Sequence, residues 1–148
     1  MGVKILVTNR RAYRDYEIQE TFEAGVSLQG TEVKSSKMGK ISLSDGWVDI
    51  VGGEAYLKSV SIALYTHGNI RNHEEKRDRK LLLHKKEIIN ISRAIEEKGF
   101  TVVPLKVYLK DSLIKFEIGV ARGRKLYDKR EYDKKKQAQV AIGRAMKR

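Results

Sequence analysis

YEIQETFEAGVSLQ, residues 16–29, alternates between apolar and polar side chains along its whole length, apart from Glu20. Its even positions otherwise hold Tyr, Ile, Phe, Ala, Val and Leu, whereas its odd positions hold polar residues and one glycine. A period of two residues predicts a long β-strand with one face on a core and the other in water. Gly25, inside this strand, predicts a bend or bulge of the kind that turns the corner of a barrel.

The next three segments predict a helix, a hairpin and a loop. TEVKSSKMGK, residues 31–40, is typical of a short helix with Thr31 as its N-cap and Gly39 as its end. WVDIVGGEAYLKSVSIALY, residues 47–65, has two glycines between two apolar runs, which indicates a β-hairpin. THGNIRNHEEKRDRK, residues 66–80, is polar and charged almost throughout, so we expect a solvated loop there.

A second helix and two more strands follow. LLLHKKEIINISRAIEEKGF, residues 81–100, predicts a helix that ends at Gly99. Its apolar stripe consists of Ile88, Ile91 and Ile95. TVVPLKVYLKDSLIKFEIGVARG, residues 101–123, predicts two alternating strands around a turn at 110–112. Pro104 should lie at a strand start or edge, because it cannot donate to a ladder. The expected inner face holds Leu105, Val107, Leu109, Ile114, Phe116, Ile118 and Val120.

These elements predict a mainly β protein with one domain over residues 1–122. The predicted fold is an antiparallel OB-like barrel with two to three flanking helices, because closure removes exposed strand edges. A chain of 148 residues is long enough for one substantial core.

The segment 123–148 is predicted to be a basic tail outside the barrel. From Arg122 to the end there are eleven Lys or Arg residues and three Asp or Glu residues, a net +8 of the chain's +12. Large apolar groups are few there and positive charges are crowded, so the tail is expected to be disordered when free. Neutralisation by a polyanionic surface would let it become helical. The charge asymmetry itself indicates a nucleic acid or an anionic membrane as partner.

Composition and motifs argue against several classes of function. The chain has no cysteine, which excludes disulfides, thiolate nucleophiles and cysteine-ligated metals. No metal-ligand spacing, nucleophile elbow or phosphate-binding glycine loop is present, so neither a cofactor nor catalysis is expected. Glu17 and Glu23 could form an acid–base pair, but exposed strand carboxylates are the simpler interpretation. No segment is long and apolar enough for a signal peptide or membrane span, which favours a cytoplasmic protein.

Several basic and aromatic residues favour RNA as the partner. OB barrels bind oligonucleotides and structured RNA with one face and its loops. Tyr13 and Tyr127 could stack on bases, and Leu82, in the middle of three leucines, could present an apolar contact to a partner. One basic cluster precedes the strand at 16–29 and consists of Lys4, Arg10, Arg11 and Arg14. A second flanks LLLH (81–84) on both sides and consists of Arg77, Arg79, Lys80, Lys85 and Lys86. The tail has too few bulky apolar groups for a membrane-surface helix.

Four stretches together resemble one protein family. TNRRAYRDYEIQETFEAGVSLQGTEVKS (8–35), GKISLSD (39–45), RKLLLHKKEI (79–88) and KGFTVVPLKVYLKDSLIKFEIGVARGRKLYDKRE (98–131) closely resemble the SsrA-binding proteins, also called small protein B. The resemblance runs through the chain in order.

The resemblance implies a bacterial ribosome-rescue factor of the cytoplasm. Such a protein, a monomer without cofactors, binds the tRNA-like domain of transfer-messenger RNA. It helps deliver this RNA, with elongation factor Tu, to ribosomes stalled without a codon. The family positions that contact the tRNA-like domain correspond to Asn9, Glu23, Leu82 and Lys115.

For the tail, the resemblance implies entry into the empty mRNA channel of the ribosome, where it becomes helical. Tyr127 would lie near the decoding-centre nucleotides of 16S rRNA, followed by Asp128, Lys129 and Arg130. A structural ribosomal protein and an RNA-processing enzyme remain alternatives. The first should co-sediment with ribosomes in stoichiometric amounts. The second should lose a chemical step on mutation of Glu17 or Glu23.

Overall fold

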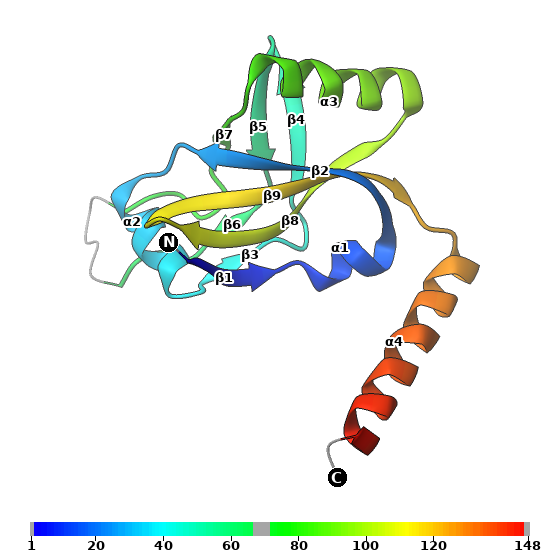
Figure 1. The fold of residues 1–148 in the computed structure, drawn as a ribbon. Coiled ribbons are helices and arrows are strands. Elements are labelled where there is room, and N and C mark those ends of the chain that lie inside the picture. Colours follow the sequence, from blue (N-terminus) through cyan, green and yellow to red (C-terminus); the bar gives the residue numbers. More distant parts are fainter. Residues whose placement is uncertain (1, 67–71, 147–148) are drawn as a thin grey trace.

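The alternating stretch forms β2 (Tyr16–Val26), which lies in the middle of a seven-stranded antiparallel sheet (Figure 1). The computed structural model describes the backbone of residues 2–66 and 72–146, and side chains of these residues except 126, 127 and 141–146. The strand order is β1-β8-β9-β2-β7-β5-β4, and β3 and β6 form a separate two-stranded sheet. The long β2 strand is confirmed.

The other elements have the following bounds. The remaining strands are β1 (Val3–Thr8), β3 (Ile41–Ser42), β4 (Trp47–Val51), β5 (Glu54–Lys58), β6 (Ser61–Ile62), β7 (Arg79–Leu82), β8 (Thr101–Lys110) and β9 (Leu113–Gly123). The helices are α1 (Arg10–Asp15), α2 (Gly30–Lys37), α3 (Lys85–Lys98) and α4 (Leu126–Met146). The predicted hairpin is confirmed as β4–β5, with Gly52 and Gly53 both at positive φ in the turn.

The bulge in β2 lies earlier than predicted, and it reverses the strand's faces. The register with β9 shifts between Ile18 and Glu20, not at Gly25. An extra residue moves every later side chain to the opposite face of a sheet. Ile18 therefore packs in a small cluster against α1, whereas Phe22 packs in the main core, although both positions are even.

A second bulge divides β8 in the same way. Its register with β9 shifts between Pro104 and Lys106. Leu105 consequently belongs to the small cluster, and Val107 belongs to the main core, so the single inner face predicted for this strand is wrong. Pro104 lies outside the part of β8 that pairs with β1, so the ladder between these two strands does not need the N–H group that proline lacks.

The predicted OB-like barrel is not confirmed, because the sheet does not close. Among the described residues, no ladder joins the outer strands β1 and β4. Instead the sheet curls until β4 lies against β8. The main core fills the space under the curl and is covered by one stripe of α3, from which Ile91 is fully buried. Side-chain packing rather than hydrogen bonding thus completes the curl.

The local helix signals are partly confirmed. Gly99 ends α3 in the left-handed conformation with φ of 66°, as expected from its position. The N-cap of α2 is Gln29, two residues before the predicted Thr31, so the helix starts at Gly30. The Glu32 carboxylate accepts a hydrogen bond from the Gln29 backbone N–H at 2.8 Å. Leu81 and Leu82 belong to β7 rather than to the start of α3, because they continue the ladder beside β2.

The tail contains the long helix α4 in this structure. Its first turns contact α1: Arg14 Nε donates to both Asp133 oxygens at 3.2 Å, and Lys129 Nζ lies 3.6 Å from Asp15. Tertiary contacts of this kind stabilise helices that are marginal alone. The rest of α4 points away from the sheet (Figure 1).

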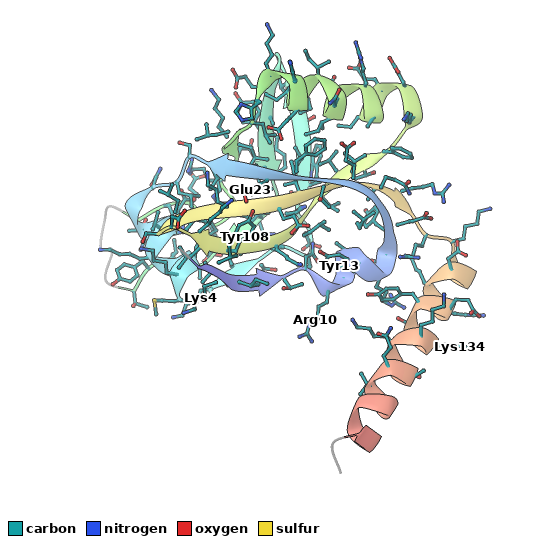
Figure 2. All side chains as sticks on the ribbon, in the orientation of Figure 1. Lys4, Arg10, Tyr13, Glu23, Tyr108 and Lys134 are labelled. Carbon is teal, nitrogen blue, oxygen red and sulfur yellow. The ribbon has the colours of Figure 1, made fainter. Side chains whose placement is uncertain are left out.

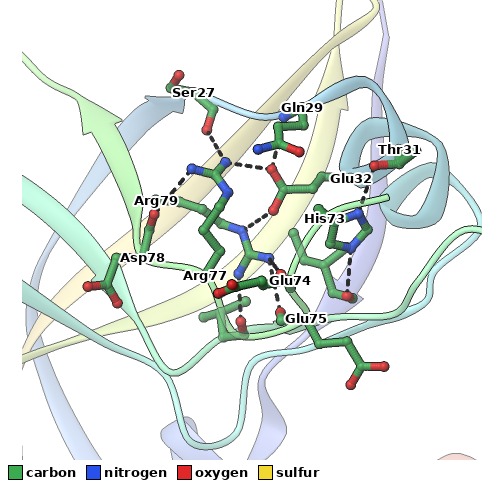
Figure 3. A network of polar contacts seen from close by, with 12 residues as sticks. Ser27, Gln29, Thr31, Glu32, His73, Glu74, Glu75, Arg77, Asp78 and Arg79 are labelled. Atoms are coloured by element: carbon green, nitrogen blue, oxygen red, sulfur yellow. Dashed lines mark hydrogen bonds and ion pairs between the residues drawn. The ribbon is translucent and has the colours of Figure 1, made fainter. Parts of the chain in front are cut away.

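The loop predicted to be solvated contains a buried ion network (Figure 3). Arg79 is fully buried, and its Nε donates to Glu32 Oε2 at 2.5 Å. Arg77 Nη2 donates to the other carboxylate oxygen, also at 2.5 Å. His73 is buried as well, with Nδ1 at 2.8 Å from the Thr31 hydroxyl, so Thr31 tethers this loop and does not cap α2. Burial of an arginine is tolerated because its charge is paired and its other N–H groups reach backbone carbonyls.

The network keeps Glu32 ionised. Burial acts to raise the pKa of the Glu32 carboxyl, but hydrogen bonds from Arg77, the Gln29 backbone and Arg79 outweigh it, and the pKa lies below its ordinary 4.5. The stabilisation is therefore fully present above pH 4.5, the unfolded-state value, and is lost as pH falls through the lower folded-state pKa.

We predict that Glu32→Gln lowers the free energy of unfolding by about 3–5 kcal/mol at pH 7, because it leaves the buried Arg79 uncompensated. Urea unfolding at pH 7 and pH 4 measures this. The difference between wild type and variant should shrink at the lower pH. Glu54→Gln, which alters an exposed pair with Lys80, is the control and should change stability by less than about 1 kcal/mol. Equal losses in both variants would contradict the prediction.

Candidate nucleic-acid interface

A row of cross-strand neighbours crosses the outer face of the sheet. Leu82 of β7 pairs with Gly25 of β2, Gly25 pairs with Lys115 of β9, and Lys115 pairs with Tyr108 of β8. Directly paired residues project from the same face of a sheet. Four strands, of which only β8 and β9 are consecutive in sequence, therefore place these residues next to one another, on the face opposite the main core.

A groove of about 450 Å³ lies over this row. Its walls come from β2, β5, β7, β9 and the start of α3. Three of the four residues predicted to contact RNA line it, namely Glu23, Leu82 and Lys115, together with Lys80 and His84. The groove thus combines an exposed apolar side chain, two lysines and three carboxylates, those of Glu23, Glu54 and Glu87.

Gly25 keeps the groove open. A Cβ at this position would lie 3.3 Å from Leu82 Cβ and 3.6 Å from Lys115 Nζ. A larger side chain would therefore occupy the space between the two. In the sequence Gly25 indicated only a bend, because the pairing that puts it between these residues is not local.

Glu23 is held in place by two neighbours. Tyr108 Oη donates to Glu23 Oε2 at 2.5 Å, and Lys110 Nζ lies 3.3 Å from Oε1. Figure 2 shows Glu23 and Tyr108 on the same part of the sheet. The Tyr108 hydrogen bond, followed by that of Lys110, lowers the pKa of Glu23 despite some burial. Burial and the same hydrogen bond raise the pKa of Tyr108. The result is an ionised acceptor beside a neutral phenol, and sequence reasoning had missed both Tyr108 and Lys110.

Asn9 does not line the groove, and its side chain is buried. Its Nδ2 donates to the carbonyls of Pro104 at 2.8 Å and Leu43 at 3.2 Å, while its Oδ1 accepts from Ala12 N and caps α1. Asn9 therefore holds α1 against β8 and the loop before β4. The family resemblance alone had named Asn9 as a position that contacts RNA, and its side chain is buried here.

The four predicted tail residues lie in the first turns of α4. Asp128 and Arg130 are exposed, whereas Lys129 is half-buried beside Asp15. The side chain of Tyr127 lies outside the described residues. The structure does not bring these residues near the groove at Gly25 (Figure 1).

The two carboxylates considered for catalysis are both engaged by donors. Glu17 accepts from Arg122 at 2.6 Å, and this hydrogen bond lowers the pKa of Glu17. Glu23 has a lowered pKa as well. A general acid near neutral pH needs a raised pKa, so this geometry favours binding over acid–base chemistry. Within residues 2–66 and 72–146, no group of three acidic or histidine side chains could hold a metal. No helix in the same ranges is long and apolar enough to cross a membrane.

Comparisons with known proteins identify the family of this chain. The SmpB protein family model matches residues 6–148. The SsrA-binding protein of Geotalea uraniireducens is 50% identical over 147 residues, covering 99% of this chain and 97% of that protein. That of Lachnoclostridium phytofermentans is 54% identical over 130 residues, covering 88% and 84%. A solved structure described as "tmRNA-SmpB: a journey to the center of the bacterial ribosome" shares 45% identity with a TM-score of 0.69, covering 81% of this chain and 85% of the other. The chain therefore belongs to the SmpB family of SsrA-binding proteins.

Proposed function

We propose that this chain binds the tRNA-like domain of transfer-messenger RNA and promotes its delivery to stalled ribosomes during trans-translation. The observation that carries the proposal is the groove over Gly25, where Glu23, Leu82 and Lys115 converge from three strands. Relatives with about 50% identity are named for binding SsrA, and a similar solved structure is described with tmRNA and the ribosome.

Each groove residue has a distinct task in this proposal. Glu23 accepts hydrogen bonds from base N–H or ribose hydroxyl groups, and Tyr108 and Lys110 fix its orientation. Leu82, 55% exposed, supplies an apolar contact to an unstacked base or sugar. Lys115 binds a phosphate, with Lys80 nearby. Asn9 acts indirectly, because its buried amide positions α1 and β8.

The tail carries the second part of the proposal. We infer that α4 enters the mRNA channel when no message fills it, with Tyr127 near the decoding nucleotides of 16S rRNA and Asp128, Lys129 and Arg130 beside it. A cationic helix is attracted to a channel lined with RNA phosphates, and a bound message would exclude it sterically. Vacancy of the channel is thereby sensed through shape and charge.

The remaining assignments follow from these partners. The protein acts in the cytoplasm as a monomer without cofactors, in a delivery complex with elongation factor Tu, and it is a binding factor rather than an enzyme. A structural ribosomal protein would instead be present on every ribosome. Sedimentation of cell extract distinguishes the two, because a rescue factor follows transfer-messenger RNA and not the bulk of the ribosomes.

We predict that Gly25→Val weakens binding of the isolated tRNA-like domain about tenfold or more, because its side chain fills the groove. Leu82→Ala and Lys115→Ala should each reduce the free energy of binding to the tRNA-like domain by about 1 kcal/mol or more. Filter binding at fixed salt measures the affinity. Gly123→Val is the matched control, since a Cβ there meets nothing within 4 Å. Unchanged affinity in a folded Gly25→Val variant would refute the groove as the binding site.

A truncation after Lys125 tests the division of labour between body and tail. The shortened chain keeps the Arg124 backbone N–H bonded to the Asp15 carbonyl at 2.8 Å, so the end of β9 stays anchored. We predict nearly unchanged affinity for the tRNA-like domain and loss of peptide tagging on stalled ribosomes in a reconstituted translation system. If affinity collapsed together with tagging, the division would be wrong.

A further inference from the structure

A second groove, separate from the one over Gly25, lies where the tail leaves the body. We name it the junction groove and define it by Thr8, Arg10, Tyr13, Lys106, Tyr132 and Lys136. Its volume is about 750 Å³, against about 450 Å³ for the groove over Gly25. One wall is formed by α1 and β8, and the other is formed by α4. Figure 2 shows Arg10 and Tyr13 on α1.

Four cationic side chains line the junction groove, and one carboxylate, Glu117, lies beside it as the cross-strand neighbour of Lys106. Arg14 also lines it, but Asp133 neutralises this guanidinium. Among the described residues, no ion pair joins Arg10, Lys106 or Lys136 to a carboxylate. Three such cations around one hollow repel each other unless an anion lies between them.

Two tyrosines supply the flat surfaces of the junction groove. Lys106 Nζ lies 6.0 Å from the centre of the Tyr13 ring, and the Arg124 guanidinium lies 5.1 Å from the centre of the Tyr132 ring. Burial, with smaller effects of Glu117 and Tyr132, raises the pKa of Tyr13, so the phenol stays neutral at physiological pH. Neutral aromatic faces flanked by cations are typical of sites that stack nucleobases and hold their phosphates.

We propose that the junction groove binds an unstacked nucleotide of single-stranded RNA, with its base on Tyr13 and Tyr132 and its phosphates on Arg10, Lys106 and Lys136. An acidic peptide would use the cations but not the two rings. The choice of RNA as the polyanion rests on the proposed function. The location, the residues and the stacking mode are independent of the groove over Gly25.

Binding at this place has a consequence for the tail. The nucleotide would contact α1 and β8 on one side and α4 on the other, so it binds only when α4 lies against the body as it does here. A ligand stabilises the arrangement for which it has the higher affinity. RNA in the junction groove therefore sets the direction in which the tail leaves the body.

The test uses the full-length protein and a fluorescein-labelled pentaadenylate RNA, with an abasic pentamer of equal charge as the second probe. Fluorescence anisotropy gives both affinities. We expect the pentaadenylate to bind about tenfold tighter than the abasic RNA because of stacking. Tyr13→Leu and Tyr132→Leu should each remove most of this advantage. Tyr56→Leu, at a half-buried tyrosine on β5 that also lies near a lysine, is the matched control and should retain it.

Equal affinities of the two probes for wild type, or equal losses in Tyr56→Leu, would overturn the proposal. A second variant avoids any effect on folding: Arg10→Ala with Lys136→Ala changes two exposed side chains. This double variant should make the slope of log affinity against log salt concentration shallower by about one to two. The control double variant on α3, Arg93→Ala with Lys98→Ala, should leave the slope unchanged. An unchanged slope would refute the phosphate contacts.

Failure of this proposal is distinguishable from failure of the proposed function. Suppose that Tyr13→Leu and Tyr132→Leu leave the affinity for pentaadenylate unchanged, while Gly25→Val still weakens binding of the tRNA-like domain. In that case only the proposal for the junction groove is refuted. If Gly25→Val has no effect but the tyrosine variants lose the stacking advantage, the groove over Gly25 is wrong and the junction groove stands.

Discussion

The bulge in β2 between Ile18 and Glu20 is the constraint on which the rest of the structure depends. One extra residue puts the first part of the strand against α1 and the second part against the main core. The same inversion turns Glu23 and Gly25 outward, onto the face where β7 and β9 present Leu82 and Lys115. A single strand thereby builds the support for α1, one wall of the core and the floor of the groove over Gly25.

Local chemistry made much of the fold predictable. Period-two alternation revealed β2, paired glycines revealed the β4–β5 hairpin, and Gly99 marked the end of α3. The larger errors concern non-local events. A bulge leaves the alternation in sequence intact while it reverses the faces in space. Arg79 looked solvated because its partner Glu32 lies 47 residues away. Closure of a barrel likewise depends on whether two distant edges form hydrogen bonds, which no local pattern encodes.

The candidate site, like the fold, could be predicted only in part. Glu23, Leu82 and Lys115 came from the family resemblance and meet in one groove, whereas Asn9 is buried in a capping role. The roles of Gly25 and Tyr108 in the site were missed because they come from pairing across strands: Gly25 leaves space, and Tyr108 orients a carboxylate. The tail's charge was evident in the sequence, but its ion pairs with α1 were not, since they join residues more than a hundred positions apart.

The central claim is that RNA lies on the outer face of β2, β7 and β9. Photo-crosslinking to the tRNA-like domain tests it most directly, with a benzophenone side chain in place of Leu82 or, as control, of Val51. The two positions are equally exposed, at 55% and 53%, but Val51 lies on the edge strand β4. The account predicts efficient crosslinks from position 82 and few from position 51. Crosslinks from position 51 with none from position 82 would contradict it.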